Sequence, residues 1–222
     1  MSQILVINPN STEEVTRSMD AALDPLRRPG GPEIASVTLA EGPLGIQSQR
    51  DVDFVVPHVC RRIAADNQSD AFVIACFSDP GLHAARETTD RPVLGISEVG
   101  MTTALNLGQR IGVIAVLKQS IARHTRYFRA MGIADRVAGE VAVDLPVVDL
   151  SDETKTRGRM LAVGRALTET HGADVLVLGC AGMARYRDEL EAALRIPVVE
   201  PTQAAVAMAL GRVQLGWGAA LR

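Results

Sequence analysis

The chain has 222 residues, of which 47 % are hydrophobic and 22 % charged, and its formal net charge is −3 at pH 7. These values are ordinary for a globular protein and exclude a disordered chain, and no run approaches the ~18 uninterrupted apolar residues of a transmembrane helix. The 23 basic residues are scattered and nearly balanced by 26 acidic ones, and aromatic residues make up only 3 %. We therefore expect no nucleic-acid partner and no membrane partner.

Short β-branched runs alternate with stretches of about 15 residues of helical pattern, which predicts βαβ units and a parallel sheet. In chain order, the expected strands are Ile4–Asn8, Glu33–Leu39, Ala71–Ala75, Val93–Ile96, Ile111–Val116, Val141–Val143, Val175–Gly179 and Val198–Val199. The expected helices are Ser11–Leu26, Asp51–Asn67, Gly81–Thr88, Glu98–Leu107, Ser120–Met131, Asp152–His171, Ala184–Leu194 and Thr202–Val213.

The first residues and the cysteine content indicate a compartment. The first ten residues lack the basic start, the long apolar centre and the cleavage site of a secretory signal. Three cysteines without such a signal are typical of free thiols in a reducing environment. We therefore expect a cytoplasmic protein.

An internal repeat is the most informative feature. Asp70–Cys76 (DAFVIAC) matches Asp174–Cys180 (DVLVLGC), and Arg91–Ser97 matches Ile196–Thr202, at an offset of 104 to 105 residues. Two copies are too few for a solenoid. The repeat predicts an α/β fold of two similar lobes, each a mostly parallel sheet flanked by helices, related by a pseudo-two-fold axis with the site in the cleft between them. We expect lobe one to comprise residues 1–105 and 205–222, and lobe two residues 106–204.

Cys76 and Cys180 each stand at the carboxyl end of a buried strand, where ligands bind in open α/β sheets. The loop after each cysteine opens a helix, so its thiol is expected to face unpaired backbone N–H groups that favour the thiolate and lower the thiol pKa. The same N–H groups can hold a carboxylate or an enolate oxygen. A free cysteine more often packs as a small hydrophobe, which is the interpretation we favour for Cys60.

Two thiols on opposite faces of one small molecule indicate stereoinversion. One thiolate removes a proton next to a carbonyl, and the other thiol returns a proton to the opposite face. This chemistry requires no cofactor, and neither Lys118 nor Lys155 is in a setting suited to a Schiff base. A zinc site is a poor alternative, because two thiolates without a CxxC or clustered histidines fall short of four ligands. A disulfide is disfavoured in a reducing compartment.

Several polar residues have a structural as well as a functional interpretation. Asp79 can cap the helix that begins near Gly81 or bind the substrate, and Ser78 can contact the ligand or only its own loop. Trp217 is expected to pack against the body of the protein or a subunit. The histidines and arginines on predicted helices that are expected to face solvent are His58, His124, His171, Arg123, Arg126 and Arg129.

Three motifs resemble the Asp/Glu/hydantoin racemase family, whose members work without pyridoxal phosphate: VINPNST at residues 6–12, CFSDPGL at 76–82 and LGCAGM at 178–183. The resemblance covers nearly the whole chain and favours the hydantoin and allantoin racemase branch over the amino-acid racemases. It implies that Cys76 and Cys180 are the paired acid and base. The substrate-binding residues that it implies are Asn10, Ser11, Thr12, Gln47, Phe77, Ser78, Asp79, Ala181, Gly182 and Met183.

The chain departs from the hydantoin-type pattern at one place. Where such members tend to carry P-x-S-I-E, this chain has PLGIQ at residues 43–47, with Gly45 in place of the serine and Gln47 in place of the carboxylate. Gln47 can donate and accept hydrogen bonds but supplies no charge. The departure bears on the substrate rather than on the chemistry, because both cysteines remain.

The resemblance therefore predicts a cofactor-independent, metal-free racemase that inverts the acidic C–H stereocentre of a small cyclic ureide, a 5-substituted hydantoin or allantoin. Two alternatives stay within the family: an Asp/Glu-type amino-acid racemase and a dicarboxylate cis–trans isomerase. A third is a non-catalytic, two-lobed small-molecule binding protein. Family members are commonly oligomeric, so the resemblance also implies a homo-oligomer.

Overall fold

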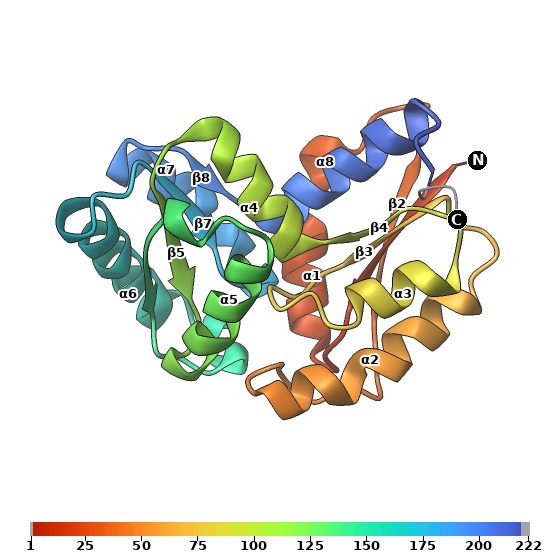
Figure 1. Cartoon of the computed structure of the whole chain (residues 1–222), viewed down its shortest axis with the longest axis horizontal. Helices are drawn as coiled ribbons and strands as arrows, with labels where there is room; N and C mark the ends of the chain where they lie inside the picture. Colours follow the sequence, from red (N-terminus) through yellow and green to blue (C-terminus); the bar gives the residue numbers. More distant parts are fainter. Residues whose placement is uncertain (1, 219–222) are drawn as a thin grey trace.

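The computed structural model describes residues 2–218 and contains two four-stranded sheets, which stand next to each other in Figure 1. The first has the order β2-β1-β3-β4, from β1 (Gln3–Asn8), β2 (Glu33–Thr38), β3 (Ala71–Ile74) and β4 (Val93–Gly95). The second has the order β6-β5-β7-β8, from β5 (Ile111–Ala115), β6 (Val137–Ala142), β7 (Val175–Leu178) and β8 (Val198–Val199). Neighbouring strands are parallel. The shared order confirms the two similar α/β lobes.

Helices cover both faces of each sheet. They are α1 (Glu13–Ala22), α2 (Gln49–Ala64), α3 (Leu82–Thr88), α4 (Ile96–Leu107), α5 (Lys118–Ala130), α6 (Glu153–Arg165), α7 (Arg187–Leu194) and α8 (Pro201–Gln214). Apolar residues of α1 and α8 pack on one face of the first sheet, and those of α2 and α3 on the other. On the second sheet, α6 and α7 share one face, and α4 and α5 the other. Burial on both faces explains why the central strands are continuously apolar. None of the helices within residues 2–218 is long and apolar enough to cross a membrane.

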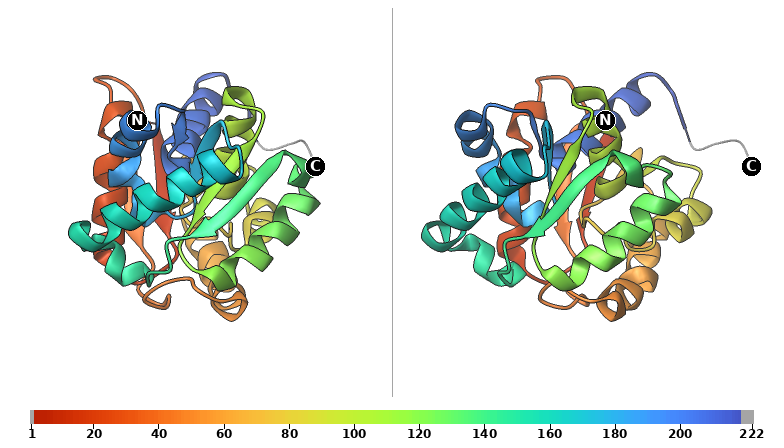
Figure 2. Two further views of the ribbon diagram at one scale, coloured as in Figure 1. Left: turned by 90° about the vertical axis from the view of Figure 1, so that its left-hand side faces the viewer. Right: turned by 60° about the vertical axis from the view of Figure 1, so that its left-hand side comes forward.

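The helix that ends each half of the chain crosses to the other lobe. α4 follows β4 of the first sheet, yet its Ala104 packs in one cluster with Val175 of the second sheet. α8 follows β8 of the second sheet, yet its Ala205 packs in one cluster with Ile4 of the first. The two helices lie side by side between the sheets (Figures 1 and 2). The expected division at residues 105/106 and 204/205 stays a prediction, and this exchange joins the lobes wherever the division is drawn.

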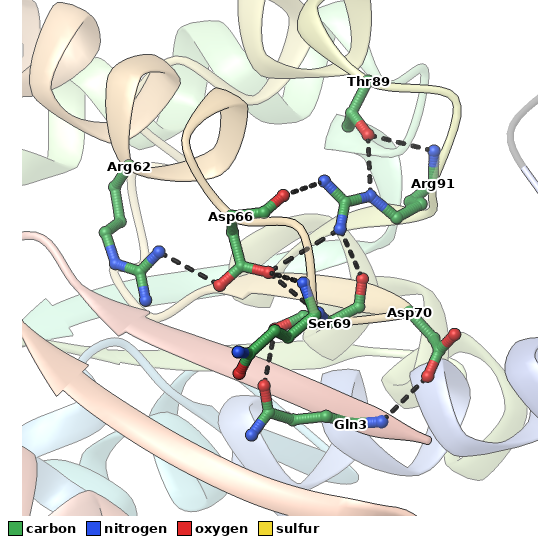
Figure 3. A network of polar contacts seen from close by, with 8 residues as sticks. Gln3, Arg62, Asp66, Ser69, Asp70, Thr89 and Arg91 are labelled. Atoms are coloured by element: carbon green, nitrogen blue, oxygen red, sulfur yellow. Dashed lines mark hydrogen bonds and ion pairs between the residues drawn. The ribbon is translucent and has the colours of Figure 1, made fainter. Parts of the chain in front are cut away.

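The two aspartates of the repeat hold strand starts together. Asp70 Oδ2 accepts the backbone N–H of Gln3 over 2.9 Å, which ties the start of β3 to the start of β1 (Figure 3). Asp174 Oδ1 accepts the backbone N–H of Arg110 over 2.8 Å, just before β5. These residues therefore play the same structural role in both lobes, at the amino ends of the strands, whereas the cysteines follow the carboxyl ends.

Three expectations differ from the structure. β6 begins at Val137 rather than Val141, because its pairing with β5 continues through residues that are only half-buried and carry no strong strand signal. The α-helical part of the segment after residue 152 ends at Arg165 and continues as a π-helical turn. Trp217 is 63 % exposed, so the expected packing against the body of the protein is wrong for this single chain, and the alternative of packing against a subunit stays a prediction.

Candidate active site

The two lobes enclose a cavity of about 40 Å³ at the carboxyl ends of their central strands. Both Cys76 and Cys180 line this cavity, although they follow strands of different sheets. An open groove of about 270 Å³ adjoins it, because Ser78 and Arg123 line both spaces. Of the residues expected at the site, those that line the cavity are Asn10, Cys76, Phe77, Ser78, Cys180 and Ala181.

Each thiol receives a backbone N–H group from the loop that follows it. Gly182 N–H donates to Cys180 Sγ over 3.4 Å, and the N–H of Ser78 favours the thiolate of Cys76 in the same way. Burial is the larger effect, and it raises the pKa of Cys76 to about 12 and that of Cys180 to about 11. The expectation of lowered thiol pKa values is therefore wrong, because desolvation outweighs the loop N–H groups in the closed site. Both thiols keep part of their surface open.

The two cysteines differ in the charge beside them. The Arg123 guanidinium lowers the pKa of Cys76 against the effect of burial. The Glu200 carboxylate acts in the opposite direction and adds to the raised pKa of Cys180. The Arg123 cation thus favours the Cys76 thiolate and the Glu200 anion disfavours the Cys180 thiolate, but burial and the nearby Asp79 carboxylate still leave the pKa of Cys76 the higher of the two.

Arg123 and its neighbour His124 correct the expectation that their helix turns these side chains to solvent. Arg123 is 9 % exposed and His124 3 % exposed, and both line the cavity. The buried face of α5 contains Ser120 and Phe128 as well. Residues 120, 124 and 128 follow at intervals of four, so the aromatic Phe128 was the signal that could have placed His124 on the inward face.

Asn10 presents a hydrogen-bond donor to the cavity. Its Oδ1 accepts from Asn8 Nδ2 over 3.1 Å and from the backbone N–H of Thr12 over 2.9 Å. These contacts fix the orientation of the amide, so that Nδ2 is the atom left over. Nδ2 makes no hydrogen bond with any residue in the described part of the chain, nor is it enclosed by protein. An Nδ2 that is free in this way suits a carbonyl or enolate oxygen of a ligand.

Asp79 lies outside the cavity and caps a helix, but not the one beginning near Gly81. Its two carboxylate oxygens accept the backbone N–H groups of Ser97 (2.9 Å) and Glu98 (2.8 Å), in the first turn of α4. Tyr127 Oη also donates to it over 3.1 Å. Burial raises the pKa of Asp79 to about 7, although these donors oppose the shift.

In the second lobe, α8 corresponds to α4, and its first turn also contacts a carboxylate, which comes from a different position in the repeat. Glu200, the N-cap of α8, accepts the backbone N–H groups of Thr202 (3.1 Å) and Gln203 (2.6 Å). The residue equivalent to Glu200 in the repeat is Gly95, and a Cβ there would collide with the Asp79 carboxylate. Each of the exchanged helices thus begins on a buried carboxylate. Glu200 was not predicted from the sequence, although the repeat aligns this carboxylic acid with Gly95 and so marks the position as unusual.

Gly45 and Gln47 belong to a loop that closes on the second lobe. A Cβ at Gly45 would come within 2.9 Å of Val147 Cβ, and Val147 lines the cavity. Gln119 Nε2 donates to the backbone oxygen of Gln47 over 3.2 Å, again across the lobes. The Gln47 side chain itself does not line the cavity. The glycine that replaces the family's serine therefore allows this loop to approach Val147.

The remaining expected residues lie around the cavity rather than in it. Ser11 donates its backbone N–H to Pro43 O, and Thr12 Oγ1 donates to Leu44 O over 2.7 Å. Thr12 and Gly182 line a small neighbouring pocket, and Met183 is fully buried in the core of the second lobe. Within residues 2–218, no three His, Cys, Asp or Glu side chains are grouped as a metal ion would need.

The chain is similar to known proteins over nearly its whole length. The family model described as Asp/Glu/Hydantoin racemase matches residues 4–209. The chain is 36 % identical to the hydantoin racemase of Pseudomonas sp. (strain NS671) over 96 % of this chain and 87 % of that protein. It is 32 % identical to the hydantoin racemase of Paenarthrobacter aurescens over 97 % of this chain and 92 % of that protein.

Solved structures of allantoin racemases share the fold of this chain. The allantoin racemase from Klebsiella pneumoniae superposes with a TM-score of 0.91 at 33 % identity, covering 99 % of this chain and 91 % of that one. The allantoin racemase from Pseudomonas fluorescens superposes with a TM-score of 0.93 at 25 % identity, covering 98 % and 93 %. Glutamate racemase from Francisella tularensis, at 16 % identity and a TM-score of 0.70, shares the fold.

Proposed function

This chain belongs to the Asp/Glu/hydantoin racemase family, in its hydantoin and allantoin racemase branch, and we propose that it inverts the acidic C–H stereocentre of a cyclic ureide with two cysteines and no cofactor. The protein is a racemase. The observation that carries the proposal is that one thiol from each lobe, Cys76 and Cys180, lines the same cavity. The relatives named hydantoin and allantoin racemases support a 5-substituted hydantoin or allantoin as the substrate.

The proposed reaction moves one proton to each face of the substrate carbon. The Cys76 thiolate takes the proton of the C–H bond, and the electron pair of that bond moves onto the neighbouring carbonyl oxygen as an enolate. The Cys180 thiol then gives its proton to the opposite face, and the pair returns from the oxygen to form the new C–H bond. The cycle ends with Cys76 as the thiol and Cys180 as the thiolate, ready for the reverse reaction.

The site supplies the two things this step requires. The enolate oxygen needs a donor that is already oriented, and the free Nδ2 of Asn10 provides one at the cavity wall. The thiolate must be basic enough to take a proton from carbon. The burial that raises both thiol pKa values makes each thiolate a stronger base, and the Arg123 cation offsets part of the cost of forming the Cys76 thiolate.

The test follows deuterium and optical rotation together. One enantiomer of several 5-substituted hydantoins and of allantoin is incubated in D2O, with an enzyme-free control for spontaneous exchange. We expect both deuterium incorporation and loss of rotation. Cys76→Ser and Cys180→Ser should each abolish racemisation but retain exchange from one enantiomer, because one base remains. Cys60→Ser, on α2 outside the cavity, is the matched control and should keep full activity.

A wild-type protein that neither exchanges nor racemises any ureide would contradict the proposal. Turnover of Asp or Glu in the same assay would support the amino-acid racemase alternative instead, and ligand binding without exchange would support a binding protein.

We also propose that the protein works as a homo-oligomer in the cytoplasm. Light scattering during size-exclusion chromatography measures the first, and a mass equal to one chain would overturn it.

A further inference from the structure

We propose that His124, oriented by Glu140, binds the substrate by accepting a hydrogen bond from a ring N–H group of the ureide, an inference that rests on the function proposed above. The two residues come from α5 and β6, and neither belongs to the motifs that identify the family. His124 lines the cavity that holds both cysteines. Together with Asn10, it would form hydrogen bonds with the substrate groups that flank the reacting carbon.

The contact between the two side chains is short and buried. His124 Nδ1 lies 2.5 Å from Glu140 Oε1, and both side chains are 4 % exposed. A carboxylate can only accept, so the proton of this contact lies on Nδ1. In the imidazole that carries only this proton, Nε2 is an acceptor.

Nε2 is the ring nitrogen of His124 that the described residues of the protein leave without a partner. The ring packs edge-on against Phe77 at a centroid distance of 5.3 Å, and it lies tilted against Phe128 at 6.2 Å. Within the described part of the chain, Nε2 has no hydrogen-bond partner, yet it is not among the enclosed polar atoms, which include Glu140 Oε2. Because His124 lines the cavity and its Nδ1 is engaged, a ligand there meets the lone pair of Nε2.

A donor on one wall and an acceptor on the other match a cyclic ureide. The Nδ2 of Asn10 can donate to a ring carbonyl, and Nε2 of His124 can accept from a ring N–H. A dicarboxylate without an amino group offers only acceptors, so it would leave Nε2 unpaired at a cost comparable to a lost hydrogen bond. The α-ammonium group of Asp or Glu can donate to Nε2, so the pair of Asn10 and His124 separates amide-like rings from plain dicarboxylates and not from amino acids.

The experiment compares a 5-substituted hydantoin with its N1-methyl and N3-methyl derivatives. For the wild type, we expect methylation of one of the two nitrogens to lower kcat/KM about tenfold or more, because Nε2 loses its donor. His124→Phe keeps the size of the ring but removes the acceptor. In this variant, the ratio of kcat/KM for the parent compound to kcat/KM for the methylated compound should fall to about twofold or less. A ratio that persists in His124→Phe would show steric exclusion of the methyl group and overturn the proposal.

A second variant guards against loss of folding, because His124→Phe leaves the Glu140 carboxylate buried without its partner. Glu140→Gln is nearly isosteric, and its amide can donate as well as accept, so it no longer fixes the proton on Nδ1. We expect the ratio of kcat/KM for the parent compound to kcat/KM for the methylated compound to fall in this variant too. The thermal unfolding midpoint checks that the variant is folded. His83→Asn, at an exposed position on α3, is the matched control and should keep the wild-type ratio.

The two proposals fail in different ways. If the wild type racemises no ureide, the proposed function is wrong. If the wild type racemises the parent and both methylated compounds with equal kcat/KM, the racemase stands and the role of His124 is wrong. Equal methylation ratios in the wild type and in Glu140→Gln would likewise overturn the role of His124.

Discussion

Arg123 of α5 and Ser78, in the loop after Cys76, are joined across the two lobes by a hydrogen bond of 3.0 Å from Nε to Oγ. Ser78 sits two residues after a cysteine of the first sheet, whereas α5 packs on the second. The bond therefore brings a buried cation to the first cysteine only when the lobes are together. It connects the closed arrangement of the lobes to the acidity of Cys76.

The first prediction concerns that cation. In Arg123→Met, the pKa of Cys76 should rise further, because burial then acts on the thiolate without a compensating charge. Fewer Cys76 thiols are then ionised at any given pH, so kcat/KM near neutral pH should fall about tenfold. Arg129→Met, exposed on the same helix, is the control. A pH profile unchanged in Arg123→Met would show that this charge does not act on Cys76.

Asp79 makes a prediction about stability against pH. Its pKa is raised from 3.8 to about 7 in the folded protein, so between these values the native state binds more protons than the unfolded state. The free energy of unfolding should therefore fall as the pH rises from about 4 to about 7, by up to ~4 kcal/mol from this group. Asp79→Asn, which does not titrate, should lack this slope. The measurement is urea unfolding of both proteins over this pH range, and parallel curves would contradict it.

The loop at Gly45 predicts a coupled pair. Gly45→Ser would place a Cβ about 2.9 Å from Val147 Cβ, so either the loop or the cavity wall must shift. We expect KM to rise and the unfolding midpoint to fall. Adding Val147→Ala to Gly45→Ser should bring KM and the unfolding midpoint part of the way back to the wild-type values, with a coupling free energy of about 1 kcal/mol. Additive effects of the two changes would mean that the loop adjusts without touching Val147.

Two glycine-to-alanine changes should act in opposite directions. At Gly95, the new methyl group would collide with the Asp79 carboxylate and disturb the cap of α4, for a loss of about 1–3 kcal/mol in the free energy of unfolding. At Gly158, inside α6, nothing lies within 4 Å of the new Cβ. There alanine should stabilise by about 0.5–1 kcal/mol through helix propensity. Chemical denaturation of both variants makes the comparison, and a tolerated Gly95→Ala would show that the cap can move.

Much of the architecture follows from local pattern. The apolar strands, the helical stretches between them and the matched Asp-to-Cys segments are visible in the printed sequence, because sheet burial and strand alternation act over a few residues. The duplicated segments also predicted that Cys76 and Cys180 would lie at the same edge of two equivalent sheets, and both line one cavity. The exact start of β6 was not predictable, because an edge strand with half-buried residues has no strong pattern.

The surroundings of the thiols depended on the tertiary structure. The inward face of α5 carries polar Arg123 and His124, and its only hydrophobic marker is Phe128, which shares the spacing of His124 but does not show that either polar residue lines the cavity. Their partners, Ser78 and Glu140, lie on other segments and meet them only when the chain packs. The thiol pKa values were decided in the same way. The loop N–H groups that the sequence implies are short-range, whereas desolvation depends on all the atoms that two closed lobes place around a sulfur, and in the folded protein it is the larger effect.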